Sequence, residues 1–168
     1  MTAYRKCLPH RVQKIVSGGQ SGTDRAALDL AIHIGMEFGG FVPKGRMAED
    51  GRLSLKYAGM IETLTSDNAE RTELNVIHSD ATLIISTGSL TGGSKLSEQL
   101  ARKHKKPILH IDLLQLSICD SASRILVWLT ACGCRTLNVA GPRASKDPTA
   151  YDDTLELLRS VFANDQAE

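Results

Sequence analysis

The stretch Ala81-Thr82-Leu83-Ile84-Ile85 and the loop Thr87-Gly88-Ser89-Leu90-Thr91-Gly92-Gly93-Ser94-Lys95 decide the fold class. The first five residues are short, apolar or β-branched and show little polar alternation, which is typical of a central strand buried on both faces of a sheet. We expect a helix from about residue 93 to 104 after the loop. A buried strand, a glycine-rich loop and a helix in this order indicate an α/β unit with a parallel sheet.

The same alternation of strand and helix continues in both directions along the chain. Further strands are predicted at 12–16, 38–42, 60–64, 108–111 and 136–140. Helices are predicted at 26–35, from 67 or 68 to 78, at 121–132 and at 148–162. The segment 44–58 is mixed and charged, which predicts a long loop with at most one helical turn. The pattern favours an α/β fold with a three-layer, doubly wound, mostly parallel sheet of about six or seven strands.

Length and charge restrict the class of protein. The 168 residues suit one domain over 1–168, with 1–11 as a flexible N-terminal extension. The net charge of +1 gives no global attraction for nucleic acid, and the basic run 102–106 suits a helix C-terminus. The chain has no apolar run of about 20 residues and no signal-peptide core. We therefore expect a cytoplasmic protein with no membrane and no nucleic-acid partner.

Three glycine-bearing loops each follow a predicted strand. They are the first loop, 17–24, the second loop, 87–95, and the third loop, 141–146. If the strands are parallel, their carboxyl ends lie on one edge of the sheet and the loops meet at one crevice. Glycine allows backbone N–H groups to approach an anion, and a helix N-terminus favours negative charge. The sequence therefore predicts a phosphate-bearing small molecule as ligand.

The first loop nearly matches the dinucleotide fingerprint G-x-G-x-x-G, with Ser17 in place of the first glycine and Gly19 and Gly22 after it. An NAD site also needs an acidic residue after the second strand. Here the segment Pro43-Lys44-Gly45-Arg46 is basic, which disfavours NAD and favours an anion near its two cations. A tight turn without any ligand remains the alternative.

The second loop differs from an ATP-binding P-loop because Ser94 precedes Lys95 where the motif needs the lysine first. We therefore predict no ATPase. The N–H groups of 92–94 can still form an anion nest at a helix start. In the alternative interpretation, Thr91 and Ser94 are plain helix caps.

Cations also accompany the third loop and a predicted helix. Arg143 can bind phosphate with two parallel hydrogen bonds, or it can be a surface residue paired with Asp147. Arg71 and Asn75 share one helix face, which either lines the crevice or is solvated. The five histidines have no metal-ligand spacing, and we predict no metal site. Free thiols are expected at the four cysteines, Cys7, Cys119, Cys132 and Cys134, the last two as helix-end packing or half a zinc site.

Six long motifs resemble the molybdenum carrier family, also called the molybdenum cofactor carrier family. They are 17–24, 39–51, 71–76, 79–84, 90–93 and 138–145, within a match over about 12–163. The resemblance implies a Rossmann-like fold, related to the lysine-decarboxylase-like phosphoribohydrolases and to DprA-type proteins. It also implies molybdenum cofactor, a molybdopterin with a terminal phosphate, as ligand. A homodimer or higher homo-oligomer and molybdoenzymes as partners are further expectations.

The leading hypothesis is a carrier or binding protein for a phosphate-bearing molecule. The expected ligand-binding residues are Gly18, Gly19, Gln20, Ser21, Gly22, Thr23, Asp24, Lys44, Arg46, Arg71, Asn75, Thr87, Gly88, Thr91, Gly92, Gly93, Ser94, Gly141, Pro142 and Arg143. The alternative is a nucleotide sensor or an N-glycosidic hydrolase of nucleoside monophosphates. Its candidate acids or bases are Asp24, Glu49, Asp50 and Glu98. The related hydrolases carry a P-G-G-x-G-T-x-x-E loop, but Gln99 stands at the glutamate position here, and a neutral amide cannot exchange a proton.

Overall fold

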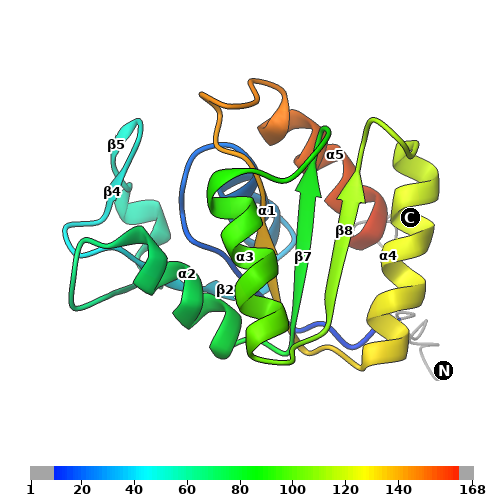
Figure 1. Cartoon of the computed structure of the whole chain (residues 1–168), viewed down its shortest axis with the longest axis horizontal. Coiled ribbons are helices and arrows are strands. Elements are labelled where there is room, and N and C mark those ends of the chain that lie inside the picture. Colours follow the sequence, from blue (N-terminus) through cyan, green and yellow to red (C-terminus); the bar gives the residue numbers. More distant parts are fainter. Residues whose placement is uncertain (1–9, 163–168) are drawn as a thin grey trace, which may run out of the picture.

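The computed structural model describes residues 10–162, which form a central sheet of five parallel strands (Figure 1). The strand order is β2-β1-β9-β7-β8. The bounds are Lys14–Val16 for β1, Glu37–Gly39 for β2, Ala81–Ser86 for β7, Ile108–Asp112 for β8 and Thr136–Ala140 for β9. Because β9 lies between β1 and β7, the loops that follow these three strands meet at one edge of the sheet.

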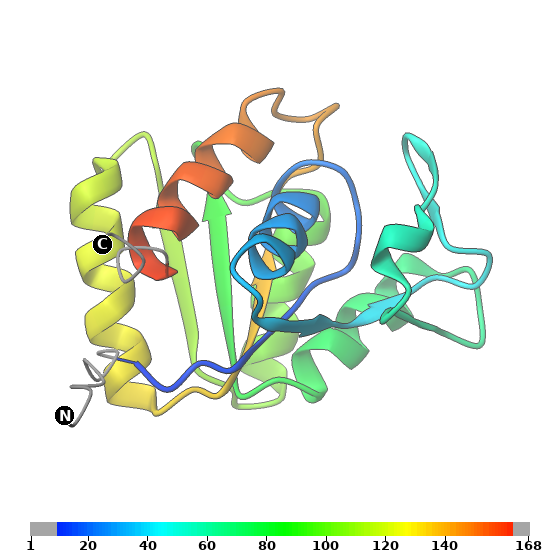
Figure 2. The same cartoon turned by 180° about the vertical axis from the view of Figure 1, so that it is seen from behind.

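Helices cover both faces of the sheet, as Figures 1 and 2 show from opposite sides. On one face lie α1 (Thr23–His33), α4 (Ile118–Cys132) and α5 (Ala150–Phe162). On the other face lie α2 (Asn68–Ile77) and α3 (Gly92–Lys103). The three-layer, Rossmann-like α/β class predicted from the sequence is confirmed.

Strand β7 shows why this arrangement follows from the sequence. All six of its residues are buried. Ala81, Leu83 and Ile85 pack into the large core shared with α1, α4 and α5. Thr82 and Ile84 point to the opposite face because side chains alternate along a strand. A strand buried on both faces therefore needs the mostly apolar, β-branched run that predicted it.

The central sheet has five strands rather than six or seven because the predicted strand 60–64 lies outside it. The predicted strand 38–42 breaks at Gly40, and only its first part stays in the central sheet, as β2. Gly40 has φ 128°, and a Cβ atom there would lie 2.3 Å from the Ser17 carbonyl oxygen. After this break, β3 (Phe41–Val42) leaves the sheet and pairs in parallel with β6 (Ile61–Glu62). The chain therefore moves away from the crevice immediately after Gly40.

The segment 44–58 is more ordered than the predicted loop. It contains an antiparallel hairpin of β4 (Met47–Ala48) and β5 (Gly51–Arg52), then the short 3-10 helix η1 (Leu55–Tyr57). Figures 1 and 2 both show this hairpin apart from the central sheet. The Tyr57 hydroxyl anchors the segment by donating to Asp29 Oδ1 on α1 at 2.5 Å.

The helix bounds differ from prediction mainly at their starts. Helix α1 begins at Thr23 rather than 26, and α4 begins at Ile118 rather than 121, where the Ser117 side chain caps it. Most of the predicted N-terminal extension lies outside the described residues. Its last part is packed, since His10 is buried with its ring 4.9 Å from that of Phe162. Within 10–162 no helix has the length and apolar character needed to cross a membrane.

Candidate functional site

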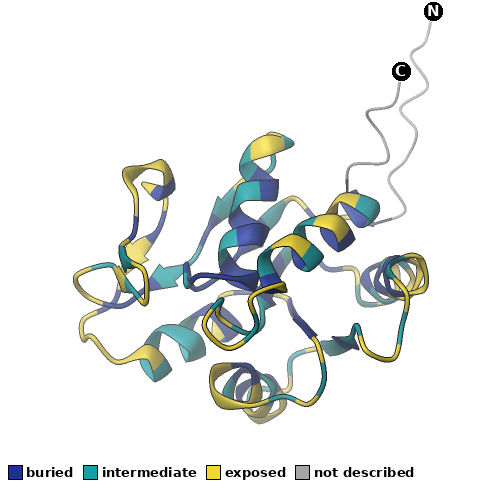
Figure 3. Cartoon of the chain, turned by 90° about the horizontal axis from the view of Figure 1, so that it is seen from above, coloured by how far each residue is buried: buried dark blue, intermediate teal, exposed yellow. Residues whose placement is uncertain are grey.

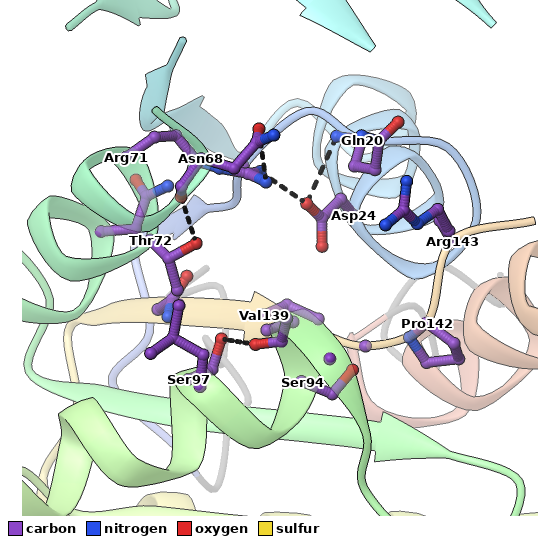
Figure 4. Close-up of a pocket in the computed structure, with 18 of the residues that line it drawn as sticks. Gln20, Asp24, Asn68, Arg71, Thr72, Ser94, Ser97, Val139, Pro142 and Arg143 are labelled. Carbon is purple, nitrogen blue, oxygen red and sulfur yellow. Dashed lines mark hydrogen bonds and ion pairs between the residues drawn. The ribbon is translucent and has the colours of Figure 1, made fainter. Parts of the chain in front are cut away.

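A cleft of about 310 Å³ opens at the carboxyl edge of the sheet (Figure 4). Figure 3 looks down on this edge, with exposed loops and outer helix faces around a buried centre. The cleft lies between the first loop, the third loop, α2 and the start of α3. Its lining residues are Gly18, Gln20, Asp24, Asn68, Ala69, Arg71, Thr72, Asn75, Thr91, Gly92, Gly93, Ser94, Leu96, Ser97, Asn138, Val139, Ala140, Gly141, Pro142, Arg143 and Lys146.

The first and third loops are packed backbone against backbone. A Cβ atom at Gly22 would lie 2.5 Å from the Pro142 carbonyl oxygen. A Cβ atom at Gly141 would lie 2.4 Å from both the Ile85 carbonyl oxygen and Thr23 Oγ1. The Thr23 amide also donates to Pro142 O at 3.2 Å. At Gly22 and Gly141, glycine therefore serves close packing between loops.

Four residues of the first loop that were assigned to the ligand do not line the cleft: Gly19, Ser21, Gly22 and Thr23. Gly19 instead faces Leu53 and Val42, and a Cβ atom there would lie 3.1 Å from each of these side chains. These four residues face away from the cleft, and the polar residues of the first loop that do line the cleft are Gln20 and Asp24.

Asp24 and Arg71 form a nearly buried ion pair across the cleft. Arg71 Nη1 lies 3.3 Å from Asp24 Oδ2, and the two side chains are 11% and 10% exposed. The Gln20 amide donates to the same carboxylate oxygen at 3.3 Å. Burial raises the pKa of Asp24, while the charge of Arg71 opposes that rise. Gly18 makes room for the guanidinium, since a Cβ atom there would overlap Arg71 Nη1.

The start of α3 forms the opposite wall and is open. Apart from the adjacent residues and the backbone of α3 itself, no heavy atom of residues 10–162 lies within 4 Å of a Cβ atom built at Gly92 or at Gly93. The N-cap residue Thr91 makes no side-chain capping bond, and the first amide groups of a helix have no partner within the helix. Ser94 is only 6% exposed, yet no described residue hydrogen-bonds its hydroxyl. By contrast, Ser97 one turn later donates to the Gly93 carbonyl oxygen at 3.0 Å.

Two cations of the third loop complete the mouth of the cleft. Arg143 and Lys146 both line it. Arg143 is 48% exposed, and its Nε lies 3.8 Å from Glu49 Oε2, too far for a hydrogen bond. Among residues 10–162, Arg143 forms no ion pair with Asp147. Figure 4 shows Arg143 beside Gln20 and Asp24, with Ser94 and Ser97 facing them from α3.

Of the four candidate acids or bases, Asp24 lines the cleft and the other three do not. Glu49 accepts hydrogen bonds from the Ser21 hydroxyl and from the Ser145 amide and hydroxyl. These bonds, with that from Ser145 the largest contribution, lower the pKa of Glu49. Asp50 pairs with Arg25 at 3.0 Å. Glu98 lies on α3 between two cations, Lys95 and Arg102.

The structure places the predicted basic segment outside the cleft. Lys44 is exposed, and Arg46 donates from its guanidinium to the carbonyl oxygens of Tyr57 at 2.9 Å and Met60 at 3.2 Å. The physical reason is the break at Gly40, after which β3 pairs with β6 outside the central sheet and the basic segment follows β3 away from the cleft. Thr87 and Gly88 also lie outside the cleft, and the Gly88 amide donates to Asp112 Oδ1 at 2.8 Å.

Arg71 and Asn75 do lie at the cleft, as one of the two interpretations predicted. The Asn75 carboxamide is occupied, since it accepts from the Phe41 amide at 2.8 Å and donates to the Phe41 carbonyl at 3.1 Å. Sequence reasoning did not select Lys146 or Asn138. Lys146 stands in the third loop, and Asn138 is a polar residue inside an apolar strand, which was the available signal. Over 10–162 no group of three or more His, Cys, Asp or Glu side chains comes together as a metal site.

Comparison with known proteins identifies the family to which the chain belongs. The model of the circularly permutated YpsA SLOG family matches residues 15–162. A crystal structure from Syntrophus aciditrophicus, of a protein named "Putative molybdenum carrier protein", is 52% identical with a TM-score of 0.90. The match covers 91% of this chain and 96% of that chain.

A second solved structure is the E-1-hydroxy-2-methyl-but-2-enyl-4-diphosphate reductase of Plasmodium falciparum. It is 13% identical, with a TM-score of 0.35 over 89% of this chain and 53% of that chain. None of the curated proteins compared with the chain matches it.

Proposed function

This chain belongs to the circularly permutated YpsA SLOG family, and on that premise we propose that it is a binding protein or carrier for a small phosphate-bearing molecule. The observation that carries the proposal is the open start of α3, where the hydroxyl of Ser94, a residue only 6% exposed, has no hydrogen-bond partner among the described residues. This hydroxyl lies across the cleft from Arg143 (Figure 4).

Each group at the mouth has a distinct role toward a phosphate. The amide groups of 92–94 donate to its oxygens, and the helix dipole favours its charge. The Ser94 hydroxyl supplies one further donor. Arg143 offers two parallel N–H groups, and Lys146 a point charge. The Asp24 carboxylate does not oppose this binding strongly because Arg71 neutralises it at 3.3 Å.

We propose molybdopterin as the cargo. The 52% identical protein named as a molybdenum carrier supports this choice. A terminal phosphate fits the donors at the start of α3, since Gly92 and Gly93 leave open space there. In this proposal the protein works in the cytoplasm as a homodimer or higher homo-oligomer and delivers its cargo to molybdoenzymes.

The test is native mass spectrometry of the protein purified from its own cells. The denatured extract is assayed for molybdenum and for pterin fluorescence. We expect a bound pterin in the wild type and its loss in Arg143→Ala. Lys44→Ala is the matched control, because it removes one positive charge outside the cleft and is expected to keep the ligand.

Two outcomes would change the proposal. A bound nucleotide without pterin replaces molybdopterin by a nucleotide and favours a sensor. A wild-type protein that carries no phosphate-bearing molecule and binds no inorganic phosphate at millimolar concentration contradicts the proposal as a whole.

One observation favours N-glycosidic hydrolysis of a nucleoside monophosphate as a second candidate function. Asp24 lines the cleft, and burial raises its pKa, which suits a carboxyl group that gives a proton to a leaving base. The measurement is release of free base from nucleoside monophosphates by purified protein. Activity is expected to disappear in Asp24→Asn and to persist in the control Asp50→Asn, whose carboxyl group pairs with Arg25 outside the cleft. No released base from any nucleotide excludes this candidate.

A further inference from the structure

The floor of the cleft contains a carboxamide whose oxygen no described group uses. Asn138 is 3% exposed, and its Nδ2 donates to Thr82 Oγ1 on the neighbouring strand β7 at 3.3 Å. Its Oδ1 has no hydrogen-bond partner among residues 10–162. This oxygen is also absent from the polar atoms that are sealed from solvent without a partner. Because Asn138 lines the cleft, its free oxygen opens toward the ligand space.

An amide is an unusual choice at this position in the sheet. Asn138 stands between Val16 on β1 and Thr82 on β7 in the parallel register. Its neighbours along the strand, Leu137 and Val139, point into the large core on the other face. Its Nδ2 holds the buried Thr82 hydroxyl, while its Oδ1 is left to face the cleft. A ligand N–H group that donates to this oxygen would take the place of solvent.

The neighbouring polar side chains at this end of the cleft, those of Ser97, Thr72 and Asn75, already form hydrogen bonds within the protein. The Ser97 hydroxyl donates to Gly93 O, and the Thr72 hydroxyl donates to Asn68 O at 2.8 Å. Both polar atoms of Asn75 bond the main chain of Phe41. Asn138 therefore offers a free acceptor among occupied neighbours. On either side, α2 and α3 contribute the apolar side chains of Ala69 and Leu96 to the lining.

We propose that Asn138 determines specificity by accepting a hydrogen bond from the ring of the ligand. The ligand class is a phosphate ester of a neutral nitrogen heterocycle. Its ring N–H or amino group donates to Asn138 Oδ1, and its flat faces lie between Ala69 and Leu96. This inference rests on the proposed function, which places the phosphate at the start of α3. Purines and pterins share this chemistry, and the experiment separates them.

The experiment measures affinities by titration calorimetry for four probes. They are AMP, purine riboside 5′-monophosphate, which lacks the amino group, 6-hydroxymethylpterin monophosphate and inorganic phosphate. We expect at least one amino-bearing probe, AMP or the pterin, to bind about tenfold more tightly than the purine riboside, because a site built around a hydrogen bond rejects the analogue that lacks it. In Asn138→Ala that probe should lose about tenfold in affinity, while inorganic phosphate changes less than twofold. The amino-bearing probe with the larger loss identifies the ring.

Asn138→Val serves as the second variant, because it keeps roughly the volume of the side chain. It removes the donor to Thr82 Oγ1, so we expect a folded protein with a urea midpoint slightly below that of the wild type. Ser123→Ala, on the exposed face of α4, is the control and should leave all affinities unchanged. Equal losses for amino-bearing and amino-lacking probes, or no loss in either Asn138 variant, overturn the role of Asn138 while phosphate binding stands. If no probe binds the wild type at millimolar concentration, the proposed function falls and this inference with it.

Discussion

In the wall formed by the first and third loops, glycines stand where backbones touch, whereas in the wall formed by the start of α3 they face open space. A Cβ atom at Gly22 or Gly141 would lie 2.5 Å or less from a backbone oxygen, but one at Gly92 or Gly93 would meet no other part of the described structure within 4 Å. We call these the packed wall, 17–24 with 141–146, and the open wall, 91–97. Glycine therefore allows close packing between protein segments in the packed wall, whereas in the open wall it leaves space for the proposed ligand.

The largest expected effect is that of Gly141→Ala in the packed wall. The new Cβ atom would overlap the Ile85 carbonyl oxygen of the central strand β7, which cannot move without breaking the sheet. We expect the free energy of unfolding to fall by about 4 kcal/mol, at the upper end of single substitutions. Urea denaturation followed by circular dichroism measures this loss. A decrease below about 1 kcal/mol would show that the two loops are not tightly packed.

The next effect concerns the ion pair that joins the packed wall to α2. Arg71→Met leaves Asp24 buried without its partner, which should lower the free energy of unfolding by about 3 kcal/mol at neutral pH. Burial already raises the pKa of Asp24, and loss of the opposing cation should raise it further. Since the folded state then holds the proton more tightly than the unfolded state, stability falls as pH rises through that interval.

The measurement is urea denaturation of Arg71→Met at pH 4.5 and pH 7.5, two values that lie above the ordinary aspartate pKa of 3.8. We expect the larger loss at the higher pH. The double variant Arg71→Met, Asp24→Asn is the control, because it removes the titrating group and should remove this pH dependence. An equal loss at both pH values in the single variant would show that Asp24 is not the group responsible.

The sequence predicted the strands and the loops after them correctly, but it did not predict the position of the basic segment, and the reason is physical. Strands such as 81–85 and 136–140 follow from local apolar runs, and the loops after them follow from parallel topology. The position of the basic segment 43–46 depends instead on a break at Gly40. That break is set by contact with the backbone of Ser17, far away in sequence. Local patterns carry no information on such contacts, so these cations were expected at the crevice and lie outside it.

The role of each glycine was also beyond sequence reasoning. A glycine-rich loop after a strand predicts a close approach of backbone to something, but does not say whether that partner is an anion or another loop. In Gly22 and Gly141 the partner is protein, as the overlap distances show. Asn138 could be recognised in the sequence as a polar residue in an apolar strand. Only the structure shows that it lies on the floor of the cleft, where a ligand can contact it.

A smaller effect is expected where the hairpin tip contacts the packed wall. The hydrogen bonds from Ser145 and Ser21 lower the pKa of Glu49 below its ordinary value of 4.5. A lowered pKa adds stability that is present above that value and is lost as pH falls through the folded pKa. Glu49→Gln should therefore lower the free energy of unfolding at pH 7 by about 1 kcal/mol or less, since the site is near the surface. In denaturation curves the difference from wild type should shrink toward pH 3, and a difference that grows on acidification would contradict this account.

The smallest effect on stability is expected in the open wall, where it should separate folding from binding. Gly93 lies in the first turn of α3 without positive φ, so Gly93→Ala should change the free energy of unfolding by about 0.5 kcal/mol or less. Its methyl group would point into the space that the proposed phosphate needs, so the affinity for inorganic phosphate should fall.

Gly92→Ala is the comparison, because Gly92 has φ 51° and an alanine there should also lower the free energy of unfolding by about 1 kcal/mol. If Gly93→Ala destabilises the fold as much as Gly141→Ala does, then Gly93 is also packed against protein and the contrast between the two walls is wrong. If it leaves both stability and phosphate affinity unchanged, the open space at the start of α3 is not where the anion binds.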